Sequence, residues 1–189
     1  MDNKIAFGNL KDFCDVLTMF KVRWWLEAGT CLGMVRENDF IAHDMDIDIG
    51  ILAEDFDWGI INVLVRDCGF KVKHIFGNRY CGFEIAFMRN TIKVDLFLFY
   101  KVGNKRWHAA WLNGGRRSET DLIKLVFDDR LVEVTTRDTF DKINENVSFF
   151  RPEFADEYLE ARYGKDWRIP NYKWNWATDP KCINNDFKI

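Results

Sequence analysis

Several common markers of function are missing from this sequence. Its five cysteines are scattered and none forms a C-x-x-C pair, so the sequence indicates neither a zinc site nor a disulfide framework. Its three histidines, His43, His74 and His108, lie far apart and lack the spacing of metal ligands. No local motif indicates a Ser-His-Asp or Cys-His nucleophile. We therefore expect reduced thiols in the core and a reaction, if any, that uses other side chains.

The chain also lacks long apolar runs and an excess of positive charge. No stretch approaches the roughly 20 apolar residues that a helix needs to cross a bilayer, and the first residues have no apolar signal region. The formal net charge is −3, so no strong basic field attracts nucleic-acid phosphates. We expect no transmembrane segment in this chain, no strong nucleic-acid binding and, for the chain as given, a cytoplasmic location.

What the sequence does contain is ample material for a core. Of its 189 residues, 48% are hydrophobic and 16% are aromatic, which is typical of a well-packed domain. We found no internal repeat, linker or low-complexity segment. The sequence therefore predicts a single domain that spans residues 1–189.

The stretch from Ile41 to Gly50 concentrates negative charge on one side of a predicted strand. Side chains of a strand alternate between its faces, so Asp44, Asp46 and Asp48 share one face, and the core face receives Met45, Ile47 and Ile49. Carboxylates at this spacing lie about 6.5 Å apart. Each neighbouring pair then costs about 2.5 kcal/mol at an effective dielectric constant near 20. An acidic edge in water is one interpretation, and a bound cation is the other.

Two other segments favour the cation. Upstream, Gly29 forms a turn after a strand and Thr30 is placed to cap a short helix, whose free N–H groups would suit a phosphate. Downstream, Asp95 interrupts the apolar run from Val94 to Phe99, where an unpaired charge is costly to bury. We therefore expect Asp95 to face the same cation as the acidic strand.

Periodicity and turn residues predict an α+β fold in which a mixed β-sheet packs against helices. Because the strand of Asp95 is reached by a meander and not by a helical crossover, the sheet is expected to be mixed. The expected helices cover Leu10–Phe20, Glu54–Asp67 and Pro152–Tyr163, and the expected strands cover Val22–Leu26, Lys71–Phe76, Tyr80–Phe87, Ile92–Tyr100, Arg106–Leu112 and Leu131–Val134.

Taken together, these motifs resemble the LicD/fukutin family, a branch of the DNA polymerase beta-like nucleotidyltransferase superfamily. The resemblance lies in an ordered set of residues: Gly29-Thr30, Leu32-Gly33, Arg36, Asp44-x-Asp46-Ile47-Asp48-Ile49-Gly50, Val94-Asp95 and the closing Tyr163-Gly164-x-x-Trp167-x-x-Pro170. It implies a nucleotidyltransferase-like fold. It also implies a Golgi or secretory location if the chain is a fragment of a longer, anchored protein.

Carboxylates on two neighbouring strands suit metal-assisted transfer at phosphorus, with Mg²⁺ or Mn²⁺ preferred by hard oxygen ligands. We expect Asp46 and Asp48 to bind the metal, with Asp44 as a less certain ligand. Asp95 is either a further metal ligand or the general base. The remaining motif residues are expected on the donor side: Gly29 and Thr30 at a phosphate, Gly33 within the same motif, and Arg36 either at the phosphate or paired with the acidic strand.

The resemblance implies a substrate class as well. Relatives transfer a phospho-alcohol, such as phosphocholine or ribitol phosphate, from a CDP-linked donor to a sugar or glycan hydroxyl and release CMP. Two alternatives stay open: a nucleotidyltransferase that moves NMP from an NTP to a small molecule or sugar, and a non-catalytic binding module. Two residue roles are also open. Glu84 is either a further ligand or paired with Arg79 or Lys93, and Arg116 and Arg117 lie either in a surface loop or in an arm that neutralises a diphosphate.

Overall fold

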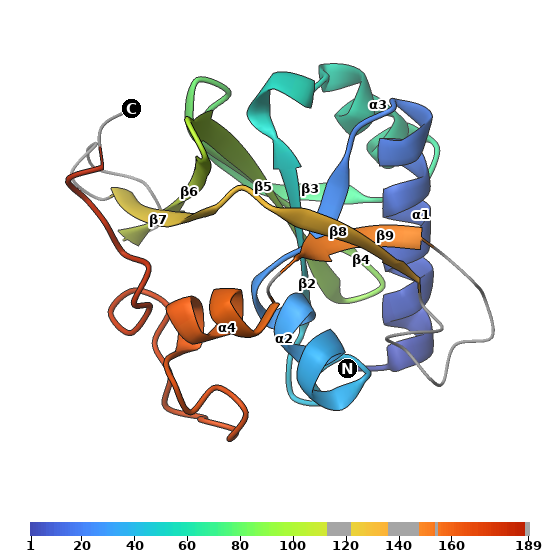
Figure 1. Cartoon of the computed structure of the whole chain (residues 1–189). Coiled ribbons are helices and arrows are strands. Elements are labelled where there is room, and N and C mark those ends of the chain that lie inside the picture. Colours follow the sequence, from blue (N-terminus) through green and yellow to red (C-terminus); the bar gives the residue numbers. More distant parts are fainter. Residues whose placement is uncertain (113–121, 136–147, 154, 188–189) are drawn as a thin grey trace.

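The computed structural model describes residues 1–112, 122–135, 148–153 and 155–187, and Figure 1 shows its arrangement. Nine strands form one mixed sheet in the order β3-β4-β5-β2-β1-β9-β8, and β6 extends from β5 and pairs with β7. The strands are β1 (Trp24–Leu26), β2 (Asp46–Leu52), β3 (Lys71–Asn78), β4 (Cys81–Arg89), β5 (Ile92–Val102), β6 (Lys105–Trp111), β7 (Leu122–Asp128), β8 (Leu131–Thr135) and β9 (Ser148–Pro152). The helices are α1 (Asn3–Met19), α2 (Ala28–Glu37), a 3₁₀ turn η1 (Ala53–Asp55), α3 (Trp58–Arg66) and α4 (Ala155–Tyr163). The predicted α+β fold with a mixed sheet is confirmed.

Helices α1 and α3 lie side by side against the sheet (Figure 1). Helix α1 is capped by Asp2, whose carboxylate accepts hydrogen bonds from the N–H groups of Lys4 and Ile5 in the first turn. Its apolar face then buries Phe13 against Phe70 and Phe87, with both ring pairs in edge-to-face geometry. This aromatic packing fixes α1 against β4 and the segment that precedes β3.

The two central strands, β2 and β5, run parallel and in a register that brings their acidic residues together. Asp46 pairs with Lys93, and Asp48 pairs with Asp95. Since paired residues on neighbouring strands point to the same face of the sheet, this register places the three carboxylates and the Lys93 ammonium on one surface.

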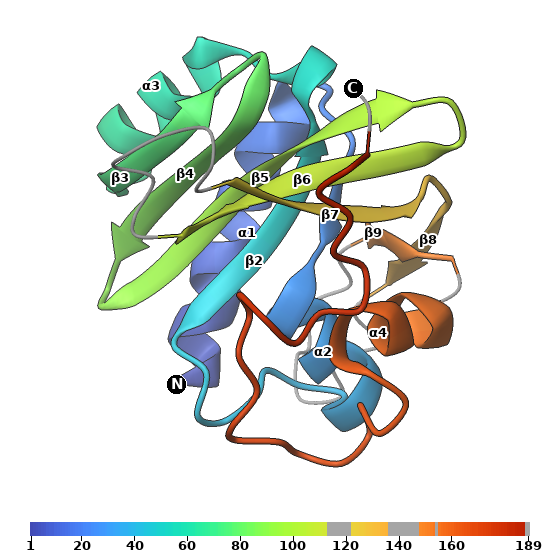
Figure 2. The same cartoon turned by 90° about the vertical axis from the view of Figure 1, so that its left-hand side faces the viewer.

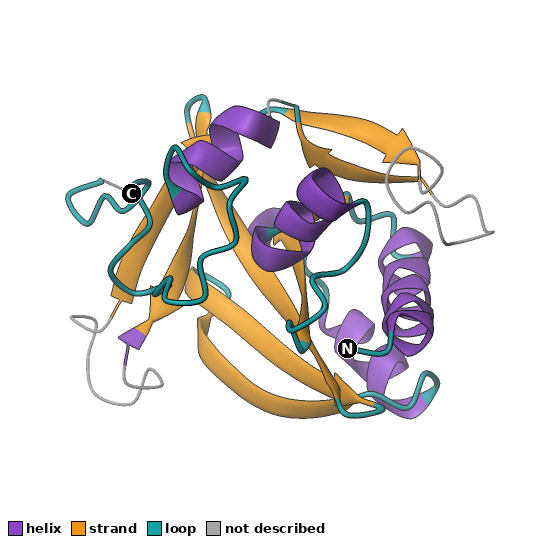
Figure 3. Cartoon of the chain, turned by 90° about the horizontal axis from the view of Figure 1, so that it is seen from below, coloured by secondary structure: helices purple, strands orange, loops and turns teal. Residues whose placement is uncertain are grey.

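Helices α2 and α4 lie next to each other at one end of these strands (Figure 3). Beyond α4 the chain continues without regular structure and returns past β2 toward β7 (Figure 2), where Ile183 forms a bridge with Leu125. The acidic surface is thus enclosed by α2, α4 and the C-terminal segment 164–187.

Several local predictions need correction. Strand β2 begins only at Asp46, so Met45 is 53% exposed and does not reach the core. Helix α2 begins after Glu27 without a side-chain cap, so Thr30 does not cap it. Pro152 ends β9 and does not open α4.

The segment predicted as one helix from Glu54 to Asp67 is instead a 3₁₀ turn followed by α3, where Val65 is exposed. Strands β7 and β9 were not predicted. Within the described residues, no helix is long and apolar enough to span a membrane.

Candidate active site

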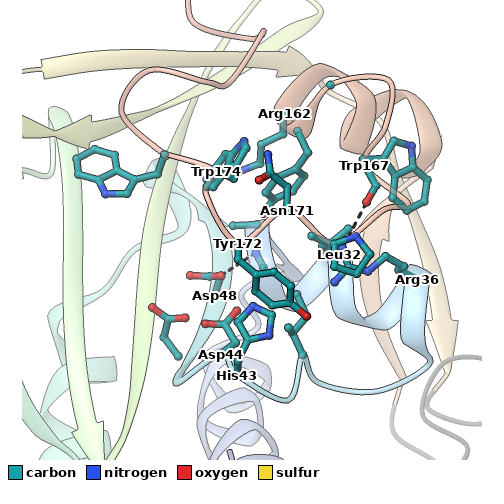
Figure 4. A pocket seen from close by; sticks show the side chains of 18 of the residues that line it. Leu32, Arg36, His43, Asp44, Asp48, Arg162, Trp167, Asn171, Tyr172 and Trp174 are labelled. Carbon is teal, nitrogen blue, oxygen red and sulfur yellow. Dashed lines mark hydrogen bonds between the residues drawn. The ribbon is translucent and has the colours of Figure 1, made fainter.

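The carboxylates of Asp46, Asp48 and Asp95 converge at the centre of the sheet. One oxygen from each lies within 4.8 Å of the others, close enough for a single ion to contact all three. Asp48 and Asp95 are buried, and Asp46 is partly exposed. Asp44 precedes the strand and joins the group at its rim, beside Asp48 in Figure 4. The sequence-predicted acidic residues therefore come together as one cluster.

Lys93 provides a positive charge inside the cluster. Its Nζ lies 2.9 Å from an oxygen of Asp46 and 2.7 Å from Oδ2 of Asp95, so one ammonium bridges the two strands. Oδ1 of Asp95 is buried and has no hydrogen-bond partner among the described residues. That oxygen has free lone pairs for a further cation or proton.

The acidic side chains respond differently to this environment. Burial, followed by the charges of Asp46 and Asp95, raises the pKa of Asp48 well above its usual value. Burial and then a hydrogen bond with Asp46 raise the pKa of Asp44 to about 7. Burial also disfavours the charged form of Asp46, but the hydrogen bond from Asp44 and the ammonium of Lys93 together lower its pKa. One cation is too few for this many carboxylates, which favours the binding of another.

The start of helix α2 holds Asp48 in place from two sides. The backbone N–H of Gly29 donates to Oδ2 of Asp48 at 2.9 Å, and the backbone N–H of Asp48 donates to the Thr30 hydroxyl at 2.8 Å. Thr30 is buried, while Gly29 lines the cavity above the cluster. Helix α2 is thus fixed to the acidic strand by these two residues.

Gly33 and Arg36, which were also predicted as site residues of α2, have different surroundings. A Cβ on Gly33 would lie 2.6 Å from the Asp39 carbonyl oxygen, so glycine allows close packing of α2 against the following loop. Arg36 lines the cavity but pairs with Glu37 at 2.5 Å and donates to the Trp167 carbonyl oxygen at 3.4 Å. No ion pair joins it to the acidic strand in the described part of the chain. Thr30 and Gly33 do not line the cavity.

Glu84 extends the acidic face onto β4. It offers an oxygen within 4.8 Å of ligand atoms of His74 and Asp95, and burial, followed by the charge of Asp95, raises its pKa to about 8. Within the described residues it forms no ion pair with Arg79 or Lys93.

A cavity of about 1260 Å³ lies over the acidic cluster. Its floor is formed by residues of β2 and β5, and its opposite wall by α4 and the C-terminal segment (Figure 4). Tyr172 extends from that segment and packs against His43, with ring centroids 5.0 Å apart (Figure 4). Further aromatic side chains line the cavity: Phe76, Phe97, Trp111, Trp167, Trp174 and Trp176. Such a cavity can enclose a substrate with ring systems next to a charged centre.

Behind the cavity, a buried polar network connects the start of α2 to α4. Glu27 accepts hydrogen bonds from Trp25 at 2.8 Å, from the Tyr158 hydroxyl and from Arg162 Nη1 at 3.3 Å. The Tyr158 hydroxyl in turn accepts from the N–H of Ala28 at 3.0 Å. Because Ala28 has a φ of +42°, this network holds a backbone conformation that is unfavourable for alanine directly before Gly29.

His108 completes the network from β6, and it predicts a measurable pH dependence. Its Nε2 lies 3.2 Å from Arg162 Nη1, and burial, followed by the charge of Arg162, lowers its pKa well below the usual value. The unfolded chain binds a proton at this histidine near pH 6.5, whereas the folded chain does not. The histidine therefore lowers the free energy of unfolding as the pH falls below about 6.5.

We expect His108→Gln to reduce the loss of stability between pH 7.5 and 5.5 by about 1 kcal/mol. Urea denaturation at both pH values measures this, and His43→Gln, at an exposed position, is the matched control. Equal pH dependence in wild type and His108→Gln would contradict the burial of a neutral imidazole.

Sequence reasoning did not identify the network, Lys93 as a bridging cation or the C-terminal wall as part of the site. The sequence signal that could have identified the network is a charged or polar residue inside an apolar stretch, as at Glu27 and Arg162. Arg116 and Arg117 lie outside the described residues.

The sequence matches the model of a known protein family. The family model for "LicD/FKTN/FKRP, nucleotidyltransferase domain" matches residues 21–134 and so includes the whole acidic cluster. The matched region is thus a nucleotidyltransferase-type domain. The chain belongs to the LicD/FKTN/FKRP family, which confirms the resemblance drawn from its motifs.

Several similar curated proteins carry transferase names. The chain is 32% identical over 169 residues to human "Ribitol-5-phosphate transferase FKTN", a match that covers 88% of this chain and 34% of the relative. It is 50% identical over 105 residues to mouse "Ribitol 5-phosphate transferase FKRP", covering 52% of this chain and 21% of the relative. The chain therefore spans about a third or less of the length of these relatives.

Two solved structures are similar at lower identity. They are the lincosamide antibiotic adenylyltransferase LnuA (16% identity, TM-score 0.48, 76% of this chain and 79% of that chain) and the antibiotic-resistance factor ANT(2'')-Ia (12% identity, TM-score 0.43, 53% and 50%).

Proposed function

We propose that this protein is a Mg²⁺- or Mn²⁺-dependent phosphotransferase that moves a phospho-alcohol, with ribitol phosphate as the first candidate, from a CDP-linked donor to a glycan hydroxyl and releases CMP. The convergence of Asp46, Asp48 and Asp95 under one large cavity is the observation that carries the proposal. The similarity to ribitol-phosphate transferases supports the choice of transferred group.

The residues of the cluster fit a hard divalent cation. They offer carboxylate oxygens only, and Oδ1 of Asp95 is buried without a hydrogen-bond partner in the described structure. Asp46, Asp48 and Asp95 would hold the ion. When bound, it would neutralise charge on the phosphate oxygens as the donor bond breaks.

The side chains of this protein then have separate tasks. Gly29 and Thr30 orient Asp48, so that its carboxylate points into the cavity. Lys93 places its ammonium between Asp46 and Asp95 and offsets part of their negative charge. Asp95 either binds the metal or takes the proton of the acceptor hydroxyl, and both roles need its free oxygen. The new bond joins the acceptor oxygen to phosphorus, and CMP leaves with the oxygen of the broken diphosphate bond.

Incubation with CDP-ribitol, Mg²⁺ and a panel of oligosaccharides tests the proposal. We expect release of CMP with equal amounts of ribitol phosphate on one acceptor, and EDTA should lower the rate by about 10³-fold or more. CTP in place of CDP-ribitol is the comparison. Incorporation of the nucleotide into the acceptor with release of pyrophosphate would overturn the proposal in favour of a nucleotidyltransferase.

A further inference from the structure

Arg162 places a buried guanidinium at the wall of the cavity. It lies near the end of α4, is 6% exposed and lines the cavity above Asp48 (Figure 4). Its two hydrogen-bond contacts, to Glu27 and His108, both use Nη1. Nε is buried and has no hydrogen-bond partner among the described residues, and Nη2 donates no hydrogen bond there.

The two unused nitrogens form the edge of the guanidinium that binds oxyanions best. Nε–H and one Nη–H project in parallel and match two oxygens of a phosphate or carboxylate. Burying a donor without a partner costs free energy, so an unused edge beside a cavity indicates a ligand group that occupies it. Glu27 balances the charge and fixes the orientation of the guanidinium from the opposite side.

Two of the other cations that line the cavity are already paired. Lys93 contacts Asp46 and Asp95, and Arg36 contacts Glu37. A diphosphate carries several negative charges and must approach a surface rich in carboxylates. It therefore needs a further cation besides any bound metal, and Arg162 has both the position and the free donors.

We propose that the free edge of Arg162 binds a phosphate of the donor diphosphate, so that the diphosphate spans from the acidic cluster on β2 and β5 to α4. The identity of the donor rests on the proposed function, but the phosphate site itself does not. A buried arginine held by a glutamate makes this site rigid.

Binding of inorganic pyrophosphate in the presence of Mg²⁺, measured by calorimetry, tests this site without turnover. We expect Arg162→Lys, which keeps the charge opposite Glu27 but lacks the planar edge, to weaken pyrophosphate binding by roughly tenfold or more. Binding of Mg²⁺ alone should stay within about twofold of wild type, because the cluster is unchanged.

Arg106→Lys is the matched control. Arg106 is also fully buried, and it stacks on Trp25 with its Cζ 4.9 Å from the ring centroid, but it does not line the main cavity. We expect this variant to bind pyrophosphate like wild type. If Arg162→Lys unfolds at a much lower temperature than Arg106→Lys, the double variant Glu27→Gln with Arg162→Gln, which removes both buried charges, replaces it.

Unchanged pyrophosphate affinity in Arg162→Lys, or an equal loss in Arg106→Lys, would overturn the assignment. The result is separable from the proposed function. Loss of pyrophosphate binding without any CMP release from CDP-ribitol would support the phosphate site and refute the transferase. CMP release together with normal pyrophosphate binding in Arg162→Lys would support the transferase and refute the phosphate site.

Discussion

Asp48→Asn is expected to lower the rate of transfer by about 10³-fold or more while leaving the protein folded. The amide oxygen can still accept the hydrogen bond from Gly29 N–H, so the start of α2 stays attached to β2. The amide cannot supply the negative charge that holds a divalent ion. Turnover should therefore be lost because of the missing charge, with little change in shape.

The free energy of unfolding, measured without metal, distinguishes the loss of the Asp48 charge from damage to the fold. Because the pKa of Asp48 is raised on folding, the folded state binds its proton more tightly, and the free energy of unfolding falls as the pH rises toward the folded pKa. Asp48→Asn removes this dependence, so it should be more stable than wild type at pH 8 in EDTA.

Asp46→Asn should change the stability in the opposite direction in the same assay. The pKa of Asp46 is lowered on folding, despite its burial, by Asp44 and Lys93, so its charge stabilises the folded state above the usual carboxylate pKa. The variant should be less stable than wild type at pH 8 and equally impaired in transfer. Urea denaturation in EDTA and the CMP-release assay measure both quantities. Substantial activity in either variant would remove that residue from the proposed metal site.

Gly29→Ala is the second variant with a large expected effect, a loss of transfer of about 10²-fold or more. A Cβ at this position would lie 2.6 Å from Oδ2 of Asp44 and 3.3 Å from Oδ2 of Asp48. Both carboxylates would have to move away from the start of α2. Alanine is otherwise favourable in a helix, so the variant should fold. Its activity should fall only because the two carboxylates are displaced.

Gly8→Ala in α1 is the control for this experiment. It is the same substitution inside a helix, and a Cβ there meets no atom within 4 Å. It should keep full activity and gain slightly in stability. If Gly29→Ala were as active as Gly8→Ala, the close packing of Gly29 against the carboxylates would not matter for the reaction.

The acidic cluster could be predicted from the sequence because its signal is local. Alternation along β2 gives the face of Asp46 and Asp48, and an isolated carboxylate in an apolar strand marks Asp95. The parallel pairing of β2 with β5, which aligns Asp48 with Asp95, was not predicted as a register. The burial cost of Asp95 was nevertheless sufficient to place it with the others.

Other parts of the site depend on contacts between distant segments. Glu27 and Arg162 are 135 positions apart and meet only because α4 packs beside α2. The C-terminal segment has no periodic pattern, so the position of Tyr172 beside His43 could not be predicted. Thr30 illustrates a related limit: its type suits a helix cap, but its hydroxyl instead accepts from the backbone of Asp48.

Anomalous diffraction from crystals soaked with Mn²⁺ and CDP tests the account most directly. We predict an anomalous peak bonded to carboxylate oxygens of Asp46, Asp48 and Asp95, with the diphosphate next to it. A peak elsewhere, with these three side chains making no bond to manganese, would contradict the assignment of this cluster as the metal centre of a phosphotransferase.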